Sequence, residues 1–217
     1  HDRMFDLVPA PGGFGTPAVG PERERVRLVG GSMFVERVIG ERLRGSVAST
    51  EIVTVAGNTI RELSRAIGFD PDPDFRVGGD TPPIGDVDEM LMIDGDGATL
   101  LGEWYLLGQA AIDHAVSSLP DAAASVGRLW PEHFDFGTDL AVRPGVRCNL
   151  GAAAGDSFDP YPYLYVGPWG TERPGPPEYW TAPFGATLTF AELQIAEDPL
   201  GRAVEFLLDG LGHLRNG

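Results

Sequence analysis

Glycine and proline set the strongest limit on what this chain can fold into. Its 217 residues include 30 glycines and 19 prolines, well above the usual share of these two residues. Glycine weakens the interiors of helices and strands, and proline removes a backbone hydrogen-bond donor, so both concentrate in turns. The chain therefore predicts short elements joined by many turns, and it argues against a helical bundle or a coiled coil.

Hydrophobic alternation and helical periodicity indicate where the regular elements lie. The expected strands are 23–28, 32–38, 133–142, 147–154, 161–166 and 179–190, and 50–55 is either a further strand or runs into the following helix. The expected helices are 59–67 with Asn58 as N-cap, 100–119 and 200–214, whereas 10–21 has the composition of a loop. This order predicts an α+β fold, in which an antiparallel sheet (a C-terminal meander plus N-terminal strands) packs against two or three helices.

The length of the chain is typical of one domain, here residues 1–217. Within it, residues 70–97 hold four prolines and nine aspartates or glutamates. Such a composition predicts an irregular acidic connection rather than a regular element of the core. The four consecutive apolar residues 90–93 are the exception, and we expect this run to pack beside the long helix.

The charge of the chain excludes several classes of function. The net charge is −16, and all sixteen basic residues are arginine. Nucleic acids and anionic membranes need a basic surface, so neither is an expected partner. The absence of lysine excludes Schiff-base chemistry and the lysine of a P-loop, and no glycine-rich dinucleotide-binding motif follows a strand, so we find neither an NAD nor a P-loop nucleotide signature. A small-molecule ligand and a second copy of the chain remain as partners.

The single cysteine, Cys148, points to a reducing compartment because it cannot form an internal disulfide. We expect it to be a buried packing residue. No apolar stretch reaches the length of a membrane span, and the beginning of the chain lacks the basic-then-apolar pattern of a signal peptide. These features together predict a cytoplasmic protein.

The most unusual chemistry of the sequence lies between residues 130 and 169. It includes Trp-Pro-Glu-His-Phe-Asp at 130–135, Ala-Ala-Gly-Asp at 153–156 and Pro-Tyr-Leu-Tyr-Val at 162–166. This segment resembles a family of uncharacterised bacterial proteins, common in actinobacteria, that carry Trp-Pro-x-His-Phe-Asp, then Ser-Pro-Gly-Asp, then Pro-Tyr-x-Tyr-Val. Ala153-Ala154 replaces Ser-Pro here, so no role for that serine is carried over. The family has no assigned activity, and the resemblance therefore implies no function.

Alternation along the expected strand 133–142 predicts a candidate site. Successive side chains of a strand point to opposite faces, so His133, Asp135 and Asp139 should share one face, opposite Phe134 and Phe136. His133 and Asp135 are the candidate catalytic residues, as an acid–base pair or as groups that hold a ligand. The candidate ligand-binding residues are Asp139, Asn149, Asp156, Tyr161, Tyr163 and Tyr165. The spacing matches no known metal signature, so whether a metal binds stays open.

The pairing of 133–142 with 147–156 has two alternatives. A two-residue turn at Pro144-Gly145 would place Asp156 opposite His133. A register one residue longer would pair Leu140 with Leu150 and give a consistent apolar face, and we favour it for that reason. In both alternatives the acidic face lies beside very small residues, which leaves room for a ligand.

The sequence does not state a function, but it supports two hypotheses. The first is the binding or processing of a small polar or sugar-like ligand on the sheet face of residues 133–169. The second is a non-enzymatic interaction or oligomerisation protein that uses the same aromatic face, with Trp169 and Trp180. A concave pocket would favour the first hypothesis, and a flat apolar patch would favour the second.

Overall fold

The chain forms two compact units. The computed structural model describes residues 7–18, 24–39, 46–74, 83–119, 121–130 and 133–217. One unit consists of His1–Glu103 with Pro131–His133, and the other of Trp104–Trp130 with Phe134–Gly217. The boundary falls inside helix α2 (Gly95–Ser117). The chain length predicted one domain, and the contacts within the chain divide it into these two units.

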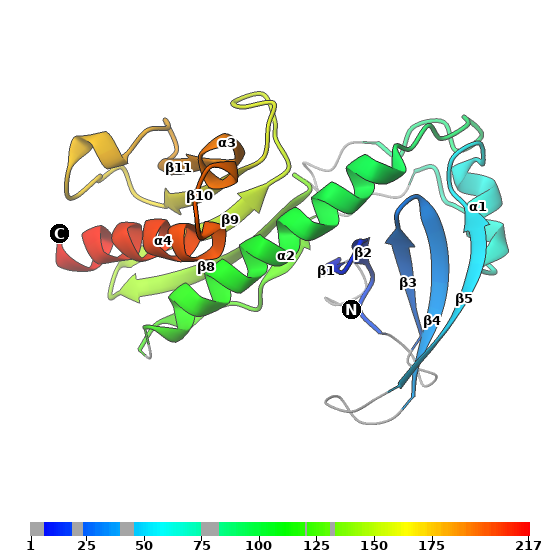
Figure 1. Cartoon of the computed structure of the whole chain (residues 1–217), viewed down its shortest axis with the longest axis horizontal. Helices are drawn as coiled ribbons and strands as arrows, with labels where there is room; N and C mark the ends of the chain where they lie inside the picture. The colour runs from blue at the N-terminus through cyan, green and yellow to red at the C-terminus, as the bar shows by residue number, and fades with distance from the viewer. Residues whose placement is uncertain (1–6, 19–23, 40–45, 75–82, 120, 131–132) are drawn as a thin grey trace. The chain divides into compact units, whose positions relative to one another are not determined.

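The first unit holds a five-stranded antiparallel meander (Figure 1). Its strands are β1 (Val8–Ala10), β2 (Gly13–Gly15), β3 (Glu24–Val29), β4 (Ser32–Ile39) and β5 (Ser46–Thr54). The two expected strands of this region are confirmed and 50–54 belongs to β5, but the expectation of a loop over 10–21 is wrong because β2 lies there. Glycine explains the error: a Cβ on Gly13 would lie 1.8 Å from the Leu28 carbonyl oxygen, so only glycine permits this approach of β2 to β3.

A buried carboxylate links β3 and β4. Glu36 is only 6% exposed, and it accepts hydrogen bonds from Arg25 Nε at 2.6 Å and Arg27 Nη1 at 3.2 Å. Arg25 and Arg27 are two residues apart on β3, so their side chains reach the same face. Two guanidinium groups therefore compensate the charge that folding removes from water.

Helix α1 (Ile60–Ala66) begins one residue later than the sequence indicated. Its N-cap is Thr59, whose hydroxyl accepts from the Glu62 N–H at 3.1 Å while the Glu62 carboxylate accepts from the Thr59 N–H at 2.8 Å. This reciprocal pair is a capping box. The predicted N-cap, Asn58, is wrong because its side chain donates to the Thr54 carbonyl instead, at 2.8 Å.

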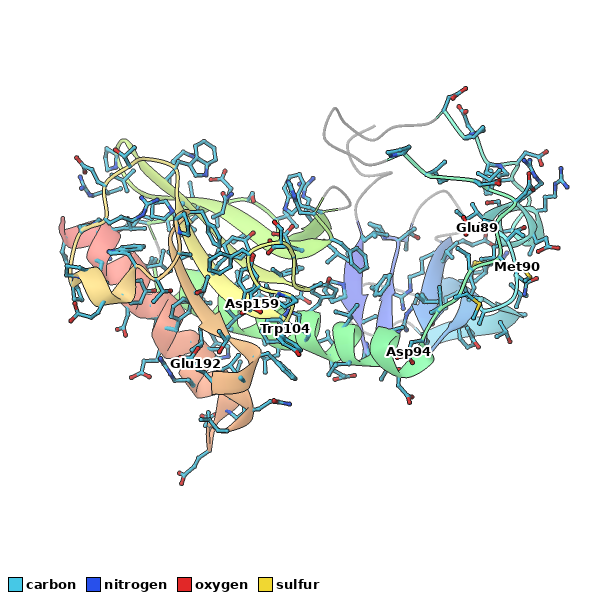
Figure 2. All side chains as sticks on the ribbon, turned by 90° about the horizontal axis from the view of Figure 1, so that it is seen from above. Glu89, Met90, Asp94, Trp104, Asp159 and Glu192 are labelled. Atoms are coloured by element: carbon cyan, nitrogen blue, oxygen red, sulfur yellow. The ribbon has the colours of Figure 1, made fainter. Side chains whose placement is uncertain are left out.

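The part of the acidic connection that precedes α2, from residue 83 onward, contacts α1. Of the expected connection 70–97, residues 70–74 and 83–94 form no helix or strand beyond one isolated bridge, as expected, whereas 75–82 lie outside the described residues. Residues 95–97 already belong to α2, so the expectation is wrong for them. Val87 is buried and its carbonyl accepts from the Arg61 N–H at 3.0 Å. Met90 (labelled in Figure 2) is 63% exposed and Met92 is 88% exposed. Leu91 and Ile93 are half-buried, and the Leu91 N–H donates to the Asn58 carbonyl at 2.9 Å, so the run 90–93 does not stay fully exposed. Its packing beside the long helix stays a prediction.

The second unit is a six-stranded antiparallel sheet with helices. In the order β11-β10-β9-β8-β6, with β7 also paired to β8, its strands are β6 (Ala123–Ala124), β7 (Arg128–Trp130), β8 (Asp135–Arg143), β9 (Val146–Ala153), β10 (Tyr163–Pro168) and β11 (Ala186–Thr189). Its further helices are η1 (Pro177–Tyr179), α3 (Phe190–Gln194) and α4 (Pro199–Asn216). The α+β class is confirmed, with two antiparallel sheets where the sequence suggested one.

Helices α2 and α4 cover one face of this sheet. A Cβ on Gly108 of α2 would lie 2.5 Å from Ala152 Cβ, and a Cβ on Gly210 of α4 would lie 3.0 Å from Val166 Cγ2. The fully buried residues of this face include Phe136, Leu140, Cys148, Leu150, Leu164 and Val166. Burial of Cys148 among them confirms its packing role, and it raises the pKa of the thiol to about 12, with a smaller contribution from Asp139.

The β8–β9 hairpin combines parts of both expected registers. Arg143 pairs with Val146 across the two-residue turn Pro144-Gly145, as in the first alternative. A bulge between Ala141 and Arg143 then shifts the remaining pairs, so that Leu140 lies opposite Cys148. Both predicted registers are wrong beyond the turn, but the bulge restores the apolar face that motivated the second one.

Candidate functional site

The face of the six-stranded sheet opposite α2 and α4 carries its polar residues, and we call it the polar face. Cross-strand pairs and alternation place on it Asp135, Gly137, Asp139, Arg147, Asn149, Gly151, Tyr163 and Tyr165. The expected side of the sheet is confirmed for Asp135, Asp139, Tyr163 and Tyr165, because the register directs Phe136, Leu150 and Leu164 to the core. Their role in a ligand site stays a prediction.

Tyr165 fills the space beside the glycines of the polar face. A Cβ on Gly151 would lie 2.2 Å from Tyr165 Cζ, so the phenol ring lies directly against this glycine. The Tyr165 hydroxyl donates a short hydrogen bond to the Asp135 carboxylate. Burial, followed by the negative charge of Asp135, raises the pKa of Tyr165 well above its ordinary value. The small residues expected to leave room for a ligand therefore accommodate a side chain of the protein.

Tyr163 forms a second tyrosine–carboxylate pair. Its hydroxyl donates to Asp156 Oδ2 at 2.7 Å, and Asp156 Oδ1 accepts from the Phe158 N–H at 2.7 Å. Burial and this hydrogen bond raise the pKa of Tyr163 above its ordinary value. The Phe158 and Tyr163 rings meet edge-on with their centroids 5.7 Å apart, and the Phe184 and Tyr165 rings do so with their centroids 6.3 Å apart. Aromatic side chains thus cover the centre of the polar face.

His133 is an exposed turn residue that precedes strand β8. The next residue, Phe134, has φ = 53°, which a bulky side chain adopts only when its surroundings hold it there. Hydrogen bonds from the Phe134 N–H to the Trp130 carbonyl and from the Tyr105 hydroxyl to the Phe134 carbonyl supply that support. Strand alternation begins only at Asp135, so it does not relate His133 to Asp135, and a ligand shared by the two stays a prediction.

Tyr161 also lies outside the predicted strand. It precedes β10 by two residues, is 70% exposed, and donates its backbone N–H to Asp159 Oδ1 at 2.9 Å. The expected stripe of three tyrosines on the polar face therefore has two members, Tyr163 and Tyr165.

Four side chains form a connected group at the hairpin end of the polar face, and we call it the Trp169 platform. Arg147 donates through Nε and Nη2 to the two carboxylate oxygens of Asp139. Its guanidinium carbon lies 4.9 Å from the centre of the Trp169 ring, a cation–π arrangement. Trp169 Nε1 in turn donates to Asn149 Oδ1 at 2.9 Å. These contacts hold an indole that is 61% exposed.

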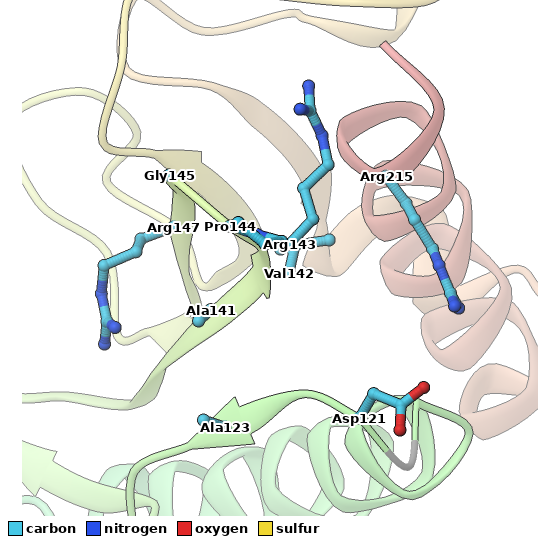
Figure 3. A pocket seen from close by; sticks show the side chains of 9 residues that line it. All are labelled: Asp121, Ala123, Ala141, Val142, Arg143, Pro144, Gly145, Arg147 and Arg215. Carbon is cyan, nitrogen blue, oxygen red and sulfur yellow. The ribbon is translucent and has the colours of Figure 1, made fainter.

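The platform borders a cavity of about 460 Å³, the Trp169 cavity. Its walls include Arg143, Arg147, Trp169, Thr171, Glu172 and Leu214. A second cavity of about 530 Å³ lies on the other side of the hairpin turn, lined by Asp121, Ala123, Ala141 and Arg215 (Figure 3). Arg143 borders both, and in Figure 3 its guanidinium points away from Asp121 and Ala123. The Arg143 Nε hydrogen-bonds to the carbonyl of Leu214, which lines only the Trp169 cavity, so the charged end of Arg143 lies toward that cavity.

The sequence pointed to the polar face but not to the Trp169 cavity beside its hairpin end. Asp139 and Asn149 were candidates and belong to the platform, whereas Arg143 and Arg147 were interpreted only as residues around a turn. The signal that could have found them is two arginines four residues apart across Pro144-Gly145, in a chain that has no lysine. Within the described ranges, no group of three or more His, Cys, Asp or Glu residues is arranged to hold a metal ion.

The described helices and the comparisons with known proteins bear on two further predictions, the absence of a membrane span and the family resemblance. No helix in the described part of the chain is long and apolar enough to cross a bilayer. No protein-family model, no curated protein and no solved structure matches the chain. The resemblance of segment 130–166 to an uncharacterised family stays a prediction, and the chemistry of the site is argued from its geometry.

Proposed function

We propose that this protein binds a small polar, sugar-like ligand in the Trp169 cavity. The observation that carries the proposal is an exposed indole, fixed by Arg147 and Asn149, at the edge of a cavity of about 460 Å³. This volume lies within the range of small-molecule sites. A flat apolar surface, the alternative considered from the sequence, would not supply such a concave wall.

The chemistry of the platform suits a sugar. The C–H groups of a sugar ring pack against an aromatic face, while its hydroxyls need fixed donors and acceptors. Trp169 supplies the first, and the polar side chains that line the cavity, Arg147, Thr171 and Glu172, supply the second. Asp139 and Asn149 hold Arg147 and Trp169 in place, so a ligand does not have to order these two side chains, which reduces the entropic cost of binding.

The contacts and positions of the candidate catalytic residues favour ligand binding over catalysis. Asp135 accepts the Tyr165 hydroxyl, and His133 lies in an exposed turn. Neither lines the Trp169 cavity. The proposal includes a cytoplasmic location, supported by the single buried cysteine, and no role for nucleic acid, supported by the net charge of −16.

The test compares two tryptophans that both carry an arginine over their ring. Neutral and acidic monosaccharides are titrated while the indole N–H resonances are followed by NMR. We expect Trp169→Ala to weaken binding about tenfold or more, in line with the loss of a stacking surface. Trp130→Ala is the matched control, because Trp130 also lies under an arginine but outside the cavity. Equal effects of the two substitutions, or no response of the Trp169 indole to any sugar, would refute the proposal.

A second function, self-association, is favoured by one observation. Tyr161, Phe158 and Trp169 expose large aromatic surfaces in the same unit, as interfaces often do. Light scattering measures this directly. A dimer that Tyr161→Ser converts to a monomer would support the interaction hypothesis, and a monomer across the accessible concentration range would contradict it.

A further inference from the structure

We infer that the Trp169 cavity selects ligands that carry an oxyanion, a carboxylate or a phosphate, and that Arg143 binds this group. The inference rests on the proposed function and adds the charge class of the ligand. Arg143 is the last residue of β8 and is half-buried in the wall of the cavity. Nothing in the sequence patterns had assigned it a role beyond the hairpin turn.

The position of the Arg143 guanidinium is set by helix α4. Its Nε donates to the Leu214 carbonyl at 3.0 Å. Leu214 lies in the last turn of α4, where carbonyl groups have no partner within the helix. This single bond anchors the side chain and leaves the two terminal nitrogens without a hydrogen-bond acceptor among the described residues. The guanidinium is thus fixed in place before any ligand arrives.

Arg143 also lacks a counter-ion, although the chain is rich in acids. Elsewhere in the described part of the protein, Arg25, Arg61 and Arg202 each form an ion pair with a carboxylate. Over the same residues, no carboxylate lies within ion-pair distance of Arg143. A half-buried charge without a counter-ion costs free energy, and an oxyanion from a ligand would offset that cost. The planar guanidinium matches the two oxygens of a carboxylate or phosphate.

The other charges around the cavity set the expected selectivity. Arg147 is already neutralised by Asp139, so it contributes little net charge. Glu172 lines the same cavity and opposes a bound anion. The C-terminal end of α4 carries partial negative charge, which the Arg143 Nε partly compensates at Leu214. Arg143 is therefore the group on which anion binding depends, and Glu172 the group that limits it.

The experiment uses three related sugars: D-glucose, D-glucuronate and D-glucose 6-phosphate. Their affinities for the full chain are measured by calorimetry at low ionic strength. We expect at least one of the two anionic sugars to bind about tenfold or more tightly than D-glucose, as for hydrogen bonds between charged groups. Preference for glucuronate alone identifies a carboxylate ligand, and preference for the phosphate alone identifies a phosphate ligand. Added salt should reduce the preference.

Variants separate the role of Arg143 from general electrostatics. Arg143→Gln should abolish the preference for the anionic sugar, so that the three sugars bind with similar affinity. Arg215→Gln removes the same charge but lines only the second cavity, so it should keep the preference. Glu172→Gln should strengthen anion binding. If Arg143→Gln does not fold, as judged by its thermal melting, Arg143→Lys retains the charge without the planar fork and should retain part of the preference.

The outcomes distinguish the two levels of the proposal. A wild-type protein that binds D-glucose as tightly as both anionic sugars would overturn the role of Arg143 and leave the sugar site intact. The same holds if Arg143→Gln retains the preference. If none of the three sugars shifts the Trp169 indole resonance, the proposed function fails, and the anion selectivity fails with it.

Discussion

At the scale of single residues, the Tyr165 ring occupies the space on the polar face that side chains at Gly137 and Gly151 would otherwise fill. Gly137, Gly151 and Tyr165 occupy one row across β8, β9 and β10. The missing side chains of the two glycines make room for the phenol ring, and Asp135 then accepts its hydroxyl. A stretch that resembles an open ligand site is therefore a packed aromatic layer, and the cavity lies farther along the sheet, beside Arg147 and Trp169 near the hairpin turn.

The first prediction concerns Gly151. In Gly151→Ala the new Cβ would lie 2.2 Å from Tyr165 Cζ, and the ring cannot move freely because Asp135 and Phe184 hold it. We expect the free energy of unfolding, measured by urea denaturation, to fall by about 1–3 kcal/mol, the usual range for overpacking.

Gly167 provides the matched control for this substitution. It is also a strand glycine next to Tyr165, but a Cβ there meets nothing closer than 3.8 Å. Gly167→Ala should therefore change the free energy of unfolding by less than about 1 kcal/mol. If the two variants are equally stable, the Tyr165 ring does not lie against Gly151.

At the scale of secondary-structure elements, short polar contacts decide where elements begin and how they pair. Helix α1 has only seven residues, so its capping box contributes a large share of its stability. Helix α3 (Phe190–Gln194) uses the same device, with Thr189 as N-cap and Glu192 as its partner. In the β8–β9 hairpin, the bulge before Arg143 combines a two-residue turn with an apolar face.

The second prediction concerns the N-cap of α1. Thr59→Ala removes the acceptor for the Glu62 N–H, and we expect a loss of about 1 kcal/mol. Hydrogen exchange of the amides of 60–66 should accelerate about fivefold. Asn58→Ala is the control, since Asn58 bonds the Thr54 carbonyl rather than a helix N–H. Equal acceleration in both variants would contradict the assignment of Thr59.

At the scale of the whole molecule, the charge composition controls how stability responds to pH. The chain has no lysine, so few groups other than tyrosine and cysteine titrate in the alkaline range. Burial raises the pKa of Tyr105, of Tyr165 and of Tyr179, and it raises that of Cys148 to about 12. These groups keep their protons in the folded state after the unfolded chain has lost them.

The third prediction follows from the sign of these shifts. A folded-state pKa above the unfolded value means that stability is fully present below the unfolded pKa, about 9–10 here, and is lost as the pH rises further. Each group that ionises only in the unfolded chain lowers the free energy of unfolding by about 1.4 kcal/mol per pH unit. Urea denaturation across this alkaline range should show the decline, and Tyr165→Phe should make it shallower. A stability that stays constant above about pH 10 would be inconsistent with buried phenols.

The fourth prediction concerns the division into two units. All four tryptophans, Trp104, Trp130, Trp169 and Trp180, belong to the second unit, whereas both units contain strands and helices. Tryptophan fluorescence therefore reports one unit and far-ultraviolet circular dichroism reports both. We expect the two signals to give different urea midpoints, because most contacts lie within units and each can unfold separately. Coincident transitions would instead indicate a single cooperative unit.

The sequence by itself determined the features that depend on neighbouring residues. Alternation along 135–142 placed Asp135 and Asp139 opposite Phe136 and Leu140, and both long helices were found, although α2 begins at Gly95 rather than at the expected residue 100. These patterns are local, because the direction of each side chain follows from the period of the backbone, and its burial follows from its own polarity. The α+β class followed from the order of such elements.

Only the tertiary structure decided which distant residues meet. Tyr165 reaches Asp135 across thirty positions of chain, and Arg143 reaches the Leu214 carbonyl across seventy-one. The bulge before Arg143 and the approach of β2 to β3 likewise depend on how whole strands pair. Neither periodicity nor composition encodes these contacts, because they result from the packing of elements that are far apart in the chain. For that reason the polar face could be predicted from the sequence, whereas the Trp169 cavity beside it could not.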